Sequence, residues 1–225
     1  PYEMDRPAES PSLAELTKRG IELLDNPNGF FLMVEGGKMD WGCHLNDAAS
    51  LVHDMAAFDE GVKAALFFAR RRPEETLIVV LADHETGGMS IDGGKSSADI
   101  FTALSAQKES SESFSRKVAD FRKNPKQTFE RILPIVIDSF GLHALSPTEL
   151  DELRQAFAQS MLPKEQRKRN REYLRRYGPY EPLSVTATRI LNRKAGITWS
   201  SFGHSSADVP VFAHGAGAEH FAGEY

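Results

Sequence analysis

The sequence predicts an α/β fold, specifically part of a layered α/β/α core with a mostly parallel sheet and a helical insertion. Two continuous apolar runs, at 30–34 and 76–81, are typical of strands that are covered on both faces. Between them, from about 45 to 71, apolar residues recur at threes and fours, as they do along a helix. A polar, Lys/Arg/Glu-rich stretch from 97 to 195 then carries helical patterns of its own.

Size and composition agree with a globular chain and exclude several classes of protein. The 225 residues, 40% of them hydrophobic, are enough to bury a core. The formal net charge is −5 and the Lys/Arg runs are short, so no nucleic-acid partner is indicated. No apolar run approaches the roughly 20 residues needed to cross a bilayer, so no membrane span is expected. The single cysteine, Cys43, excludes a disulfide framework within the chain.

The first helix is predicted from local signals. Residues 1–10 are polar and rich in proline, which indicates a linker. Ser12 is a typical helix N-cap, and Glu15 stands three residues later as its capping-box partner. The helix is expected to continue to about Leu24.

A βαβ unit is predicted next. Residues 30–35 and 76–82 are expected to be parallel strands, joined through the helix at 45–71 by a right-handed crossover. In open α/β sheets, ligands bind beyond the carboxyl ends of the strands. Polar clusters at 35–44 and 83–84 follow the two strands directly, so we expect them to share one site.

The predicted domain organisation has an interrupted core. Residues 1–96 and 196–225 form the α/β core, and 97–195 form the helical insertion. Two further strands are expected near 197–202 and 209–213, because both stretches are apolar and bounded by turn residues.

Carboxylate and imidazole side chains in these clusters have the spacing of metal ligands. Asp40 and His44 are four residues apart, so on a helix both fall on one face and can bind one ion. Asp83 and His84 precede a Glu-Thr-Gly-Gly turn, and His204 lies in a Gly-His-Ser-Ser loop. Each feature alone also has an explanation without a metal. Asp40 and His44 fit a helix-terminal Asp with a surface His, Asp83 and His84 fit a polar loop, and His204 fits an ordinary loop histidine.

In combination, the motifs resemble those of the alkaline phosphatase family. They are Glu-Gly-Gly-x-x-Asp-x-x-x-His, Asp-His-Glu-Thr-Gly-Gly, and Gly-His-Ser-Ser-x-Asp-Val-Pro-Val-Phe-Ala. The resemblance covers 1–96 and 196–225. At 30–37 and 208–213 the residues themselves match closely, as well as their spacing. The stretch between the two parts is less characteristic of the family.

The resemblance implies two zinc ions and one magnesium ion. The implied ligands are Asp40, His44 and His204 for the first zinc, Asp83 and His84 for the second zinc, and Glu35 for the magnesium. Trp41 occupies a position that varies within the family and is expected to tune phosphate or magnesium binding.

The resemblance further implies a metal-dependent phosphate monoester hydrolase, of which this chain is the C-terminal half. No residue here matches the family's nucleophilic serine, so no catalytic residue is assigned within the chain and the serine is expected upstream. Ser205 and Ser206 follow a candidate ligand but do not match the nucleophile motif. The implied partners are a phosphate monoester, the missing N-terminal half and a second copy in a homodimer. The implied location is periplasmic or secreted, and the fragment alone is expected to be nearly inactive.

Two alternatives stay open from the sequence. One is another metal-dependent member of the superfamily, such as a phosphodiesterase, a phosphoglycerate mutase or a sulfatase. Glu35 favours the three-metal monoesterase over these relatives. The other is a non-catalytic, metal-binding fragment.

Overall fold

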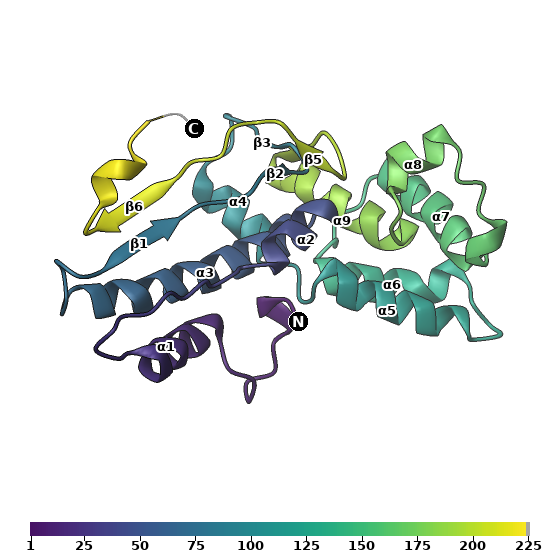
Figure 1. Ribbon diagram of the computed structural model, residues 1–225. Helices are drawn as coiled ribbons and strands as arrows, with labels where there is room; N and C mark the ends of the chain where they lie inside the picture. The colour runs from purple at the N-terminus through teal and green to yellow at the C-terminus, as the bar shows by residue number, and fades with distance from the viewer. Residues whose placement is uncertain (224–225) are drawn as a thin grey trace.

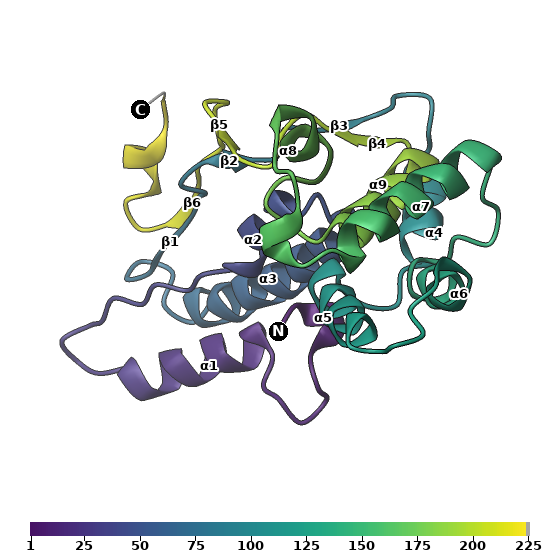
Figure 2. The same cartoon turned by 90° about the vertical axis from the view of Figure 1, so that its right-hand side faces the viewer.

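The structure is a computed structural model that describes residues 1–223. It has an α/β part and a helical part, which lie at opposite ends of Figure 1 and are seen from the helical side in Figure 2. The helices are α1 (Leu13–Leu24), α2 (Lys38–His44), α3 (Ala48–Ala69), α4 (Ser97–Leu104), α5 (Ser111–Arg122), α6 (Phe129–Phe140), α7 (Pro147–Met161), α8 (Arg171–Tyr177) and α9 (Pro182–Ala195). The strands are β1 (Leu77–Val80), β2 (Glu85–Thr86), β3 (Met89–Ile91), β4 (Ile197–Trp199), β5 (His204–Ser205) and β6 (Phe212–Gly215).

The local signals of the sequence appear as predicted. The Ser12 hydroxyl accepts a hydrogen bond from the backbone N–H of Glu15, and the Glu15 carboxylate accepts one from the backbone N–H of Ser12. This capping box begins α1, which ends at Leu24 as expected. The long helix α3 begins after Asp47, whose side chain caps it by accepting from the Ser50 N–H.

The predicted pairing of strands is wrong. Among the described residues, 30–35 form no strand, and β1 pairs antiparallel with β6 rather than parallel with that segment. The other two sheets, β2 with β5 and β3 with β4, are also antiparallel pairs. The mixture of helices and strands confirms the α/β class, but the small sheets replace the mostly parallel sheet that was expected.

The apolar run at 30–34 misled the prediction because only one of its faces is covered. The segment is extended, and burial alternates along it: Leu32 packs near Gly20 of α1, whereas Phe31 is 87% exposed and Met33 is 77% exposed. A run of apolar residues indicates burial on both faces but does not specify which strand lies alongside. No strand pairs with this segment among the residues that the structure describes.

The helical part has a core of its own. Helices α5 to α9 enclose a cluster of fully or nearly fully buried side chains that includes Phe114, Val118, Ile132, Val136, Phe140, Leu153, Leu183 and Ile190. A smaller cluster joins the two parts, with Ala48 and Ala49 of α3 against Ile100 of α4 and Ile197 of β4. The domain boundary at residue 97 stays a prediction. No described helix is both long and apolar enough to span a membrane.

Candidate metal centre

Helix α2 presents two of the predicted ligands on one face. Asp40 and His44 are one turn apart, and Oδ2 of Asp40 lies 3.5 Å from Nε2 of His44. Both side chains are partly exposed. The i, i+4 spacing in the sequence therefore has the geometric consequence expected on a helix.

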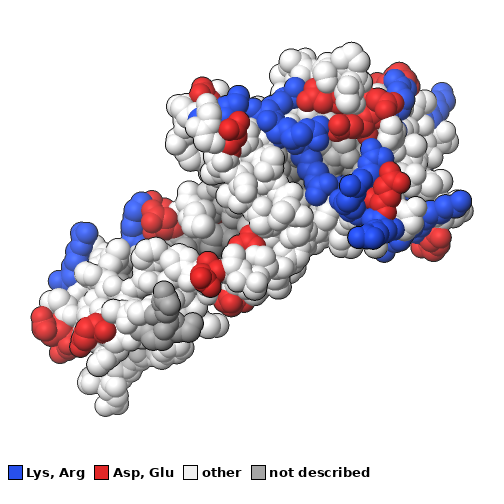
Figure 3. Space-filling view, turned by 90° about the horizontal axis from the view of Figure 1, so that it is seen from above, with Lys and Arg blue, Asp and Glu red and all other residues white. Residues whose placement is uncertain are grey.

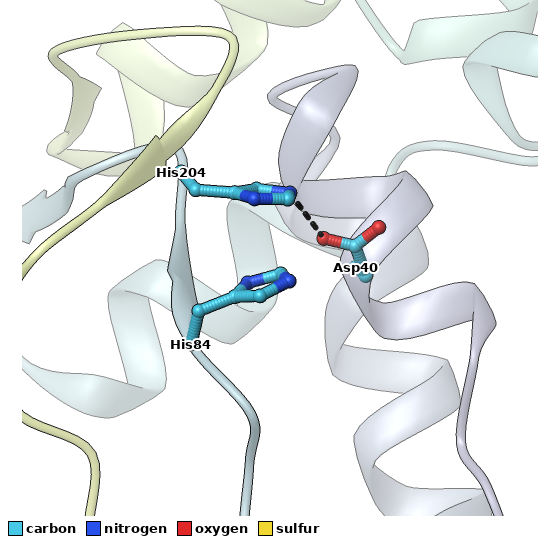
Figure 4. A group of neighbouring side chains, drawn as sticks. All are labelled: Asp40, His84 and His204. Atoms are coloured by element: carbon cyan, nitrogen blue, oxygen red, sulfur yellow. Dashed lines mark ion pairs between the residues drawn. The ribbon is translucent and has the colours of Figure 1, made fainter.

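The histidines His84 and His204 reach the same place from the small β2–β5 sheet. His204 on β5 is paired with Thr86 on β2, and His84 lies immediately before β2. The rings of His84 and His204 stack with centroids 3.6 Å apart, and both point toward Asp40 in Figure 4. Nε2 of His204 lies 3.6 Å from Oδ1 of Asp40.

The distances among these side chains suit one ion. Asp40, His84 and His204 each offer a ligand atom, and these atoms all lie within 4.8 Å of one another. Nε2 of His44 is 3.0 Å from Nε2 of His204. Zinc–ligand bonds of about 2.0–2.1 Å in a tetrahedron separate the ligand atoms by about 3.3–3.4 Å. The separations of 3.0, 3.5 and 3.6 Å found among Asp40, His44 and His204 are close to that value.

Hydrogen bonds hold two of the imidazoles in the tautomer that a metal requires. The backbone carbonyl of Phe202 can only accept, so His44 donates to it from Nδ1 at 2.7 Å. The Thr86 hydroxyl donates to Oδ1 of Asp40 at 2.7 Å and therefore accepts from Nδ1 of His84 at 3.1 Å. In both neutral rings Nε2 keeps its lone pair, which is the arrangement that a hydrogen bond from Nδ1 imposes on metal-binding histidines.

A Gly-Gly turn allows the two strands to approach α2 closely. Gly87 has φ +92°, and a side chain there would meet the Trp199 ring at 2.6 Å and the Cys43 carbonyl at 3.0 Å. The N–H of Gly87 donates to the carbonyl of Gly203, next to His204. Only glycine fits this position, so the turn after His84 is also what brings His204 to the site.

Burial raises the pKa values of two titratable groups near the site. Burial, with added repulsion from Asp40 and Glu85, raises the pKa of the Cys43 thiol to about 12, so Cys43 stays a neutral thiol near pH 7 and does not offer a thiolate. Burial, and to a lesser degree the charge of Asp40, also raises the pKa of Tyr180. Tyr180 therefore stays a neutral phenol.

Comparison with known proteins identifies the family. The family model described as alkaline phosphatase matches residues 1–225. The chain belongs to the alkaline phosphatase family.

Relatives of this alkaline phosphatase chain include bacterial and fungal proteins. It is 32% identical over 225 residues to alkaline phosphatase 3 of Bacillus subtilis (strain 168), covering 100% of this chain and 43% of that protein. It is 30% identical over 233 residues to the repressible alkaline phosphatase of Saccharomyces cerevisiae, covering 95% of this chain and 38% of that protein. The chain thus spans less than half the length of these curated relatives.

Solved structures of alkaline phosphatases also resemble this chain. A cold-active alkaline phosphatase from a psychrophilic Shewanella species matches with a TM-score of 0.72 and 27% identity, over 98% of this chain and 48% of the other. The alkaline phosphatase of Thermus thermophilus matches with a TM-score of 0.75 and 25% identity, over 97% of this chain and 46% of the other. The likeness extends over both the α/β part and the helical part.

The remaining predicted site residues of this alkaline phosphatase chain are Asp83, which lies beside His84, and the exposed Glu35 and Trp41. The Asp83 side chain is 85% exposed, with Oδ2 3.3 Å from Nε2 of His84. Glu35 is exposed at the end of the extended segment. Trp41 is 56% exposed, and Nζ of Lys38 lies 3.6 Å from the centre of its ring. His84, predicted with Asp83 for the second zinc, also stacks on His204 of the first set.

Two positioning residues were not predicted from the sequence. Thr86 is buried between Asp40 and His84, although its motif had suggested only a turn. Asn46 is fully buried just after α2 and has φ +54°. Its side-chain amide donates to the carbonyls of Cys43 and Ser201, so it joins the end of α2 to the loop that carries His204. A polar Asn-Asp pair just after a short helix was the only available signal for Asn46.

Proposed function

We propose that this chain supplies most of the metal ligands of a metal-dependent phosphate monoester hydrolase. In this proposal Asp40, His44 and His204 hold one zinc, Asp83 and His84 hold a second, and Glu35 binds magnesium. The observation that carries it is the convergence of Asp40, His44 and His204, with ligand atoms 3.0–3.6 Å apart from two distant parts of the chain. Membership of the alkaline phosphatase family supports the same activity.

The residues of the site have distinct tasks in this function. When bound, the cations supply Lewis-acid polarisation of phosphoryl oxygens and offset the charge of the transition state. The carbonyl of Phe202 and the hydroxyl of Thr86 keep the protons of His44 and His84 on Nδ1, which leaves Nε2 of each ring free to bind. Asp40 contributes a carboxylate that is already oriented by the Thr86 hydroxyl. Such preorganisation spares the site from rearranging during the reaction.

The nucleophile belongs, in this proposal, to sequence outside these 225 residues. The relatives are more than twice as long as the matched region, which leaves room for a serine nucleophile and an arginine that binds the phosphate. The exposed apolar side chains of Phe31 and Met33 are suited to contact that missing N-terminal half. The complete protein would act as a homodimer and would be periplasmic or secreted.

A phosphatase assay tests the proposal. Hydrolysis of p-nitrophenyl phosphate is followed at alkaline pH with excess zinc and magnesium, for the pure 225-residue chain and for the protein encoded by the complete reading frame. We expect zinc-dependent turnover by the complete protein and at most a small residual rate from the chain, because the remaining groups of a hydrolase retain some activity. Equal rates would show that a serine within the chain is the nucleophile, with Ser205 and Ser206 the first to replace. No turnover by the complete protein would favour a non-catalytic metal-binding role.

A further inference from the structure

A pocket of about 480 Å³ adjoins the metal centre on the side of the helical part. Trp41 and His44 of α2 form one wall, so the pocket opens beside a predicted metal ligand. Other lining residues come from the stretch between α7 and α9 and include Lys164, Arg169 and Tyr180. The helical part therefore contributes directly to the surroundings of the metal centre.

Positive charge exceeds negative charge in this pocket. Four cationic side chains line it, against the two carboxylates Glu112 and Glu181. Two of the cations, Arg122 and Arg167, share the carboxylate of Glu181, with N–O distances of 3.0 and 3.4 Å. In Figure 3, Lys and Arg side chains gather over this helical end of the molecule, with acidic side chains among them.

The other two cations of the pocket have no carboxylate partner among the described residues. Lys164 is exposed and makes no ion pair there, and Arg169 is exposed and donates only to the backbone carbonyl of Pro179, at 3.0 Å. Glu112, by contrast, is already paired with Lys38 and Arg116. Lys164 and Arg169 are therefore the groups that can bind an anion without breaking an existing ion pair.

Aromatic rings connect the pocket to the metal centre. Trp41 is 56% exposed on the pocket wall. The Tyr180 ring packs on Phe202 with centroids 5.8 Å apart, and Phe202 is the residue whose carbonyl holds His44. A flat, anionic molecule could contact these rings and the cations together.

We propose that this pocket is a subsite for a leaving group that carries a second anionic group beside a flat ring, as in a nucleoside diphosphate. The terminal phosphate would lie at the metal centre, and the inner phosphate would bind Lys164 and Arg169. This inference rests on the proposed phosphatase function of the metal centre. It assigns the helical part a role in substrate selection, in addition to its structural role.

Binding to the zinc-loaded chain tests the subsite. The affinities for ADP, AMP and inorganic phosphate are measured by isothermal titration calorimetry at fixed free zinc, for the wild-type chain and for Lys164→Gln/Arg169→Gln. We expect the wild-type chain to bind ADP about tenfold more tightly than AMP, because charge-assisted hydrogen bonds to the inner phosphate add affinity. In the double variant this ratio should fall to near one, with the affinity for inorganic phosphate unchanged.

A matched control removes the same charge from outside the pocket. Lys168 and Arg171 are exposed on the same segment but do not line the pocket, so Lys168→Gln/Arg171→Gln should keep the wild-type ratio. An ADP preference that survives Lys164→Gln/Arg169→Gln, or no preference in the wild-type chain, would overturn the subsite. If neither the zinc-loaded chain nor the zinc-loaded complete protein binds inorganic phosphate, the proposed function fails. ADP binding that still depends on Lys164 and Arg169 would then support the subsite alone, and no ADP binding would overturn both proposals.

Discussion

The helical part and the α/β part of the molecule differ most in how completely they bury their apolar side chains. In the helical part, Phe114, Val136 and Phe140 are fully buried within one continuous cluster. In the α/β part, many large apolar side chains are exposed, namely Phe31, Met33, Leu77, Leu81, Met89, Ile91 and Phe212. Exposed apolar residues gathered in one part of a protein mark a surface that is suited to contact another surface.

This difference in burial indicates that the two parts have different roles. The helical part has its own core and can serve as a rigid support, whereas the short antiparallel strands of the α/β part lack a covered sheet. The metal centre lies in the α/β part, beside a pocket that residues of the helical part also line. Asp47 illustrates the junction: buried at the start of α3, its carboxylate accepts hydrogen bonds from Gln107 and from the backbone N–H of Ser111 in the helical part.

The comparison predicts very different effects for the same substitution in the two parts. Phe140→Ala should lower the free energy of unfolding by about 3–5 kcal/mol, because it leaves a cavity at a fully buried site. Phe31→Ala should change it by no more than about 0.5 kcal/mol, because that side chain is 87% exposed. Urea unfolding of both variants measures this. A cost for Phe31→Ala similar to that for Phe140→Ala would break the comparison.

The junction itself is tested at Asn46. Its side chain donates to the carbonyls of Cys43 and Ser201 and accepts from Arg189 at 3.1 Å, all at a fully buried position. Asn46→Ala should therefore cost about 2–4 kcal/mol, since buried polar groups lose their partners.

Asn46→Gly separates the hydrogen bonds from the backbone conformation. The φ of +54° disfavours alanine, and the left-handed conformation costs most residues roughly 1–2 kcal/mol. Glycine adopts it freely, so Asn46→Gly should unfold at a higher urea concentration than Asn46→Ala. If the two variants are equally stable, the backbone conformation at this position contributes nothing measurable.

A smaller, pH-dependent effect is expected at Asp54 in the α/β part. Burial raises the pKa of this carboxyl to about 6, despite the hydrogen bond that it accepts from the backbone N–H of Glu3. The folded state therefore holds this proton more tightly than the unfolded state. The resulting stabilisation is complete below about pH 4, the ordinary range of a free Asp, and is lost as pH rises through about 6.

Asp54→Asn removes this dependence. The slope of unfolding free energy between pH 4 and 6 should become flatter by less than about 1.4 kcal/mol per pH unit, the limit for one proton, because the group is only partly buried. Urea titrations at pH 4, 5, 6 and 7 measure the slope. An identical slope in wild-type and variant chains would show that Asp54 titrates as it does in the unfolded chain.

Local signals of the sequence predicted more of the fold than its long-range patterns did. The capping box of Ser12 and Glu15 involves neighbours along the chain, and α1 begins and ends where it indicated. The run at 30–34 was assigned to a parallel sheet wrongly, because strand pairing depends on residues far away in the sequence. An apolar run contains no information about its partner.

In the candidate site, too, some residues could be predicted from the sequence and others could not. Family motifs named Asp40, His44 and His204, which the structure places within reach of one another across about 160 residues. The supporting groups could not be predicted, because the Phe202 carbonyl acts through its backbone and Thr86 lies in a motif that indicates only a turn. Hydrogen bonds between distant segments follow no sequence period.

Zinc titration of the metal-free chain by calorimetry tests the central claim most directly, namely that side chains from distant segments of the α/β part form one metal site. His204→Ala removes a proposed ligand, and His143→Ala is the matched control, since His143 is exposed in the helical part. We predict that the wild-type chain and His143→Ala bind zinc equally. His204→Ala should bind it about 100-fold more weakly or worse, since even replacing a residue that only hydrogen-bonds to a ligand costs about 10–100-fold in metal affinity. Equal zinc affinity in wild-type and His204→Ala chains would contradict the account.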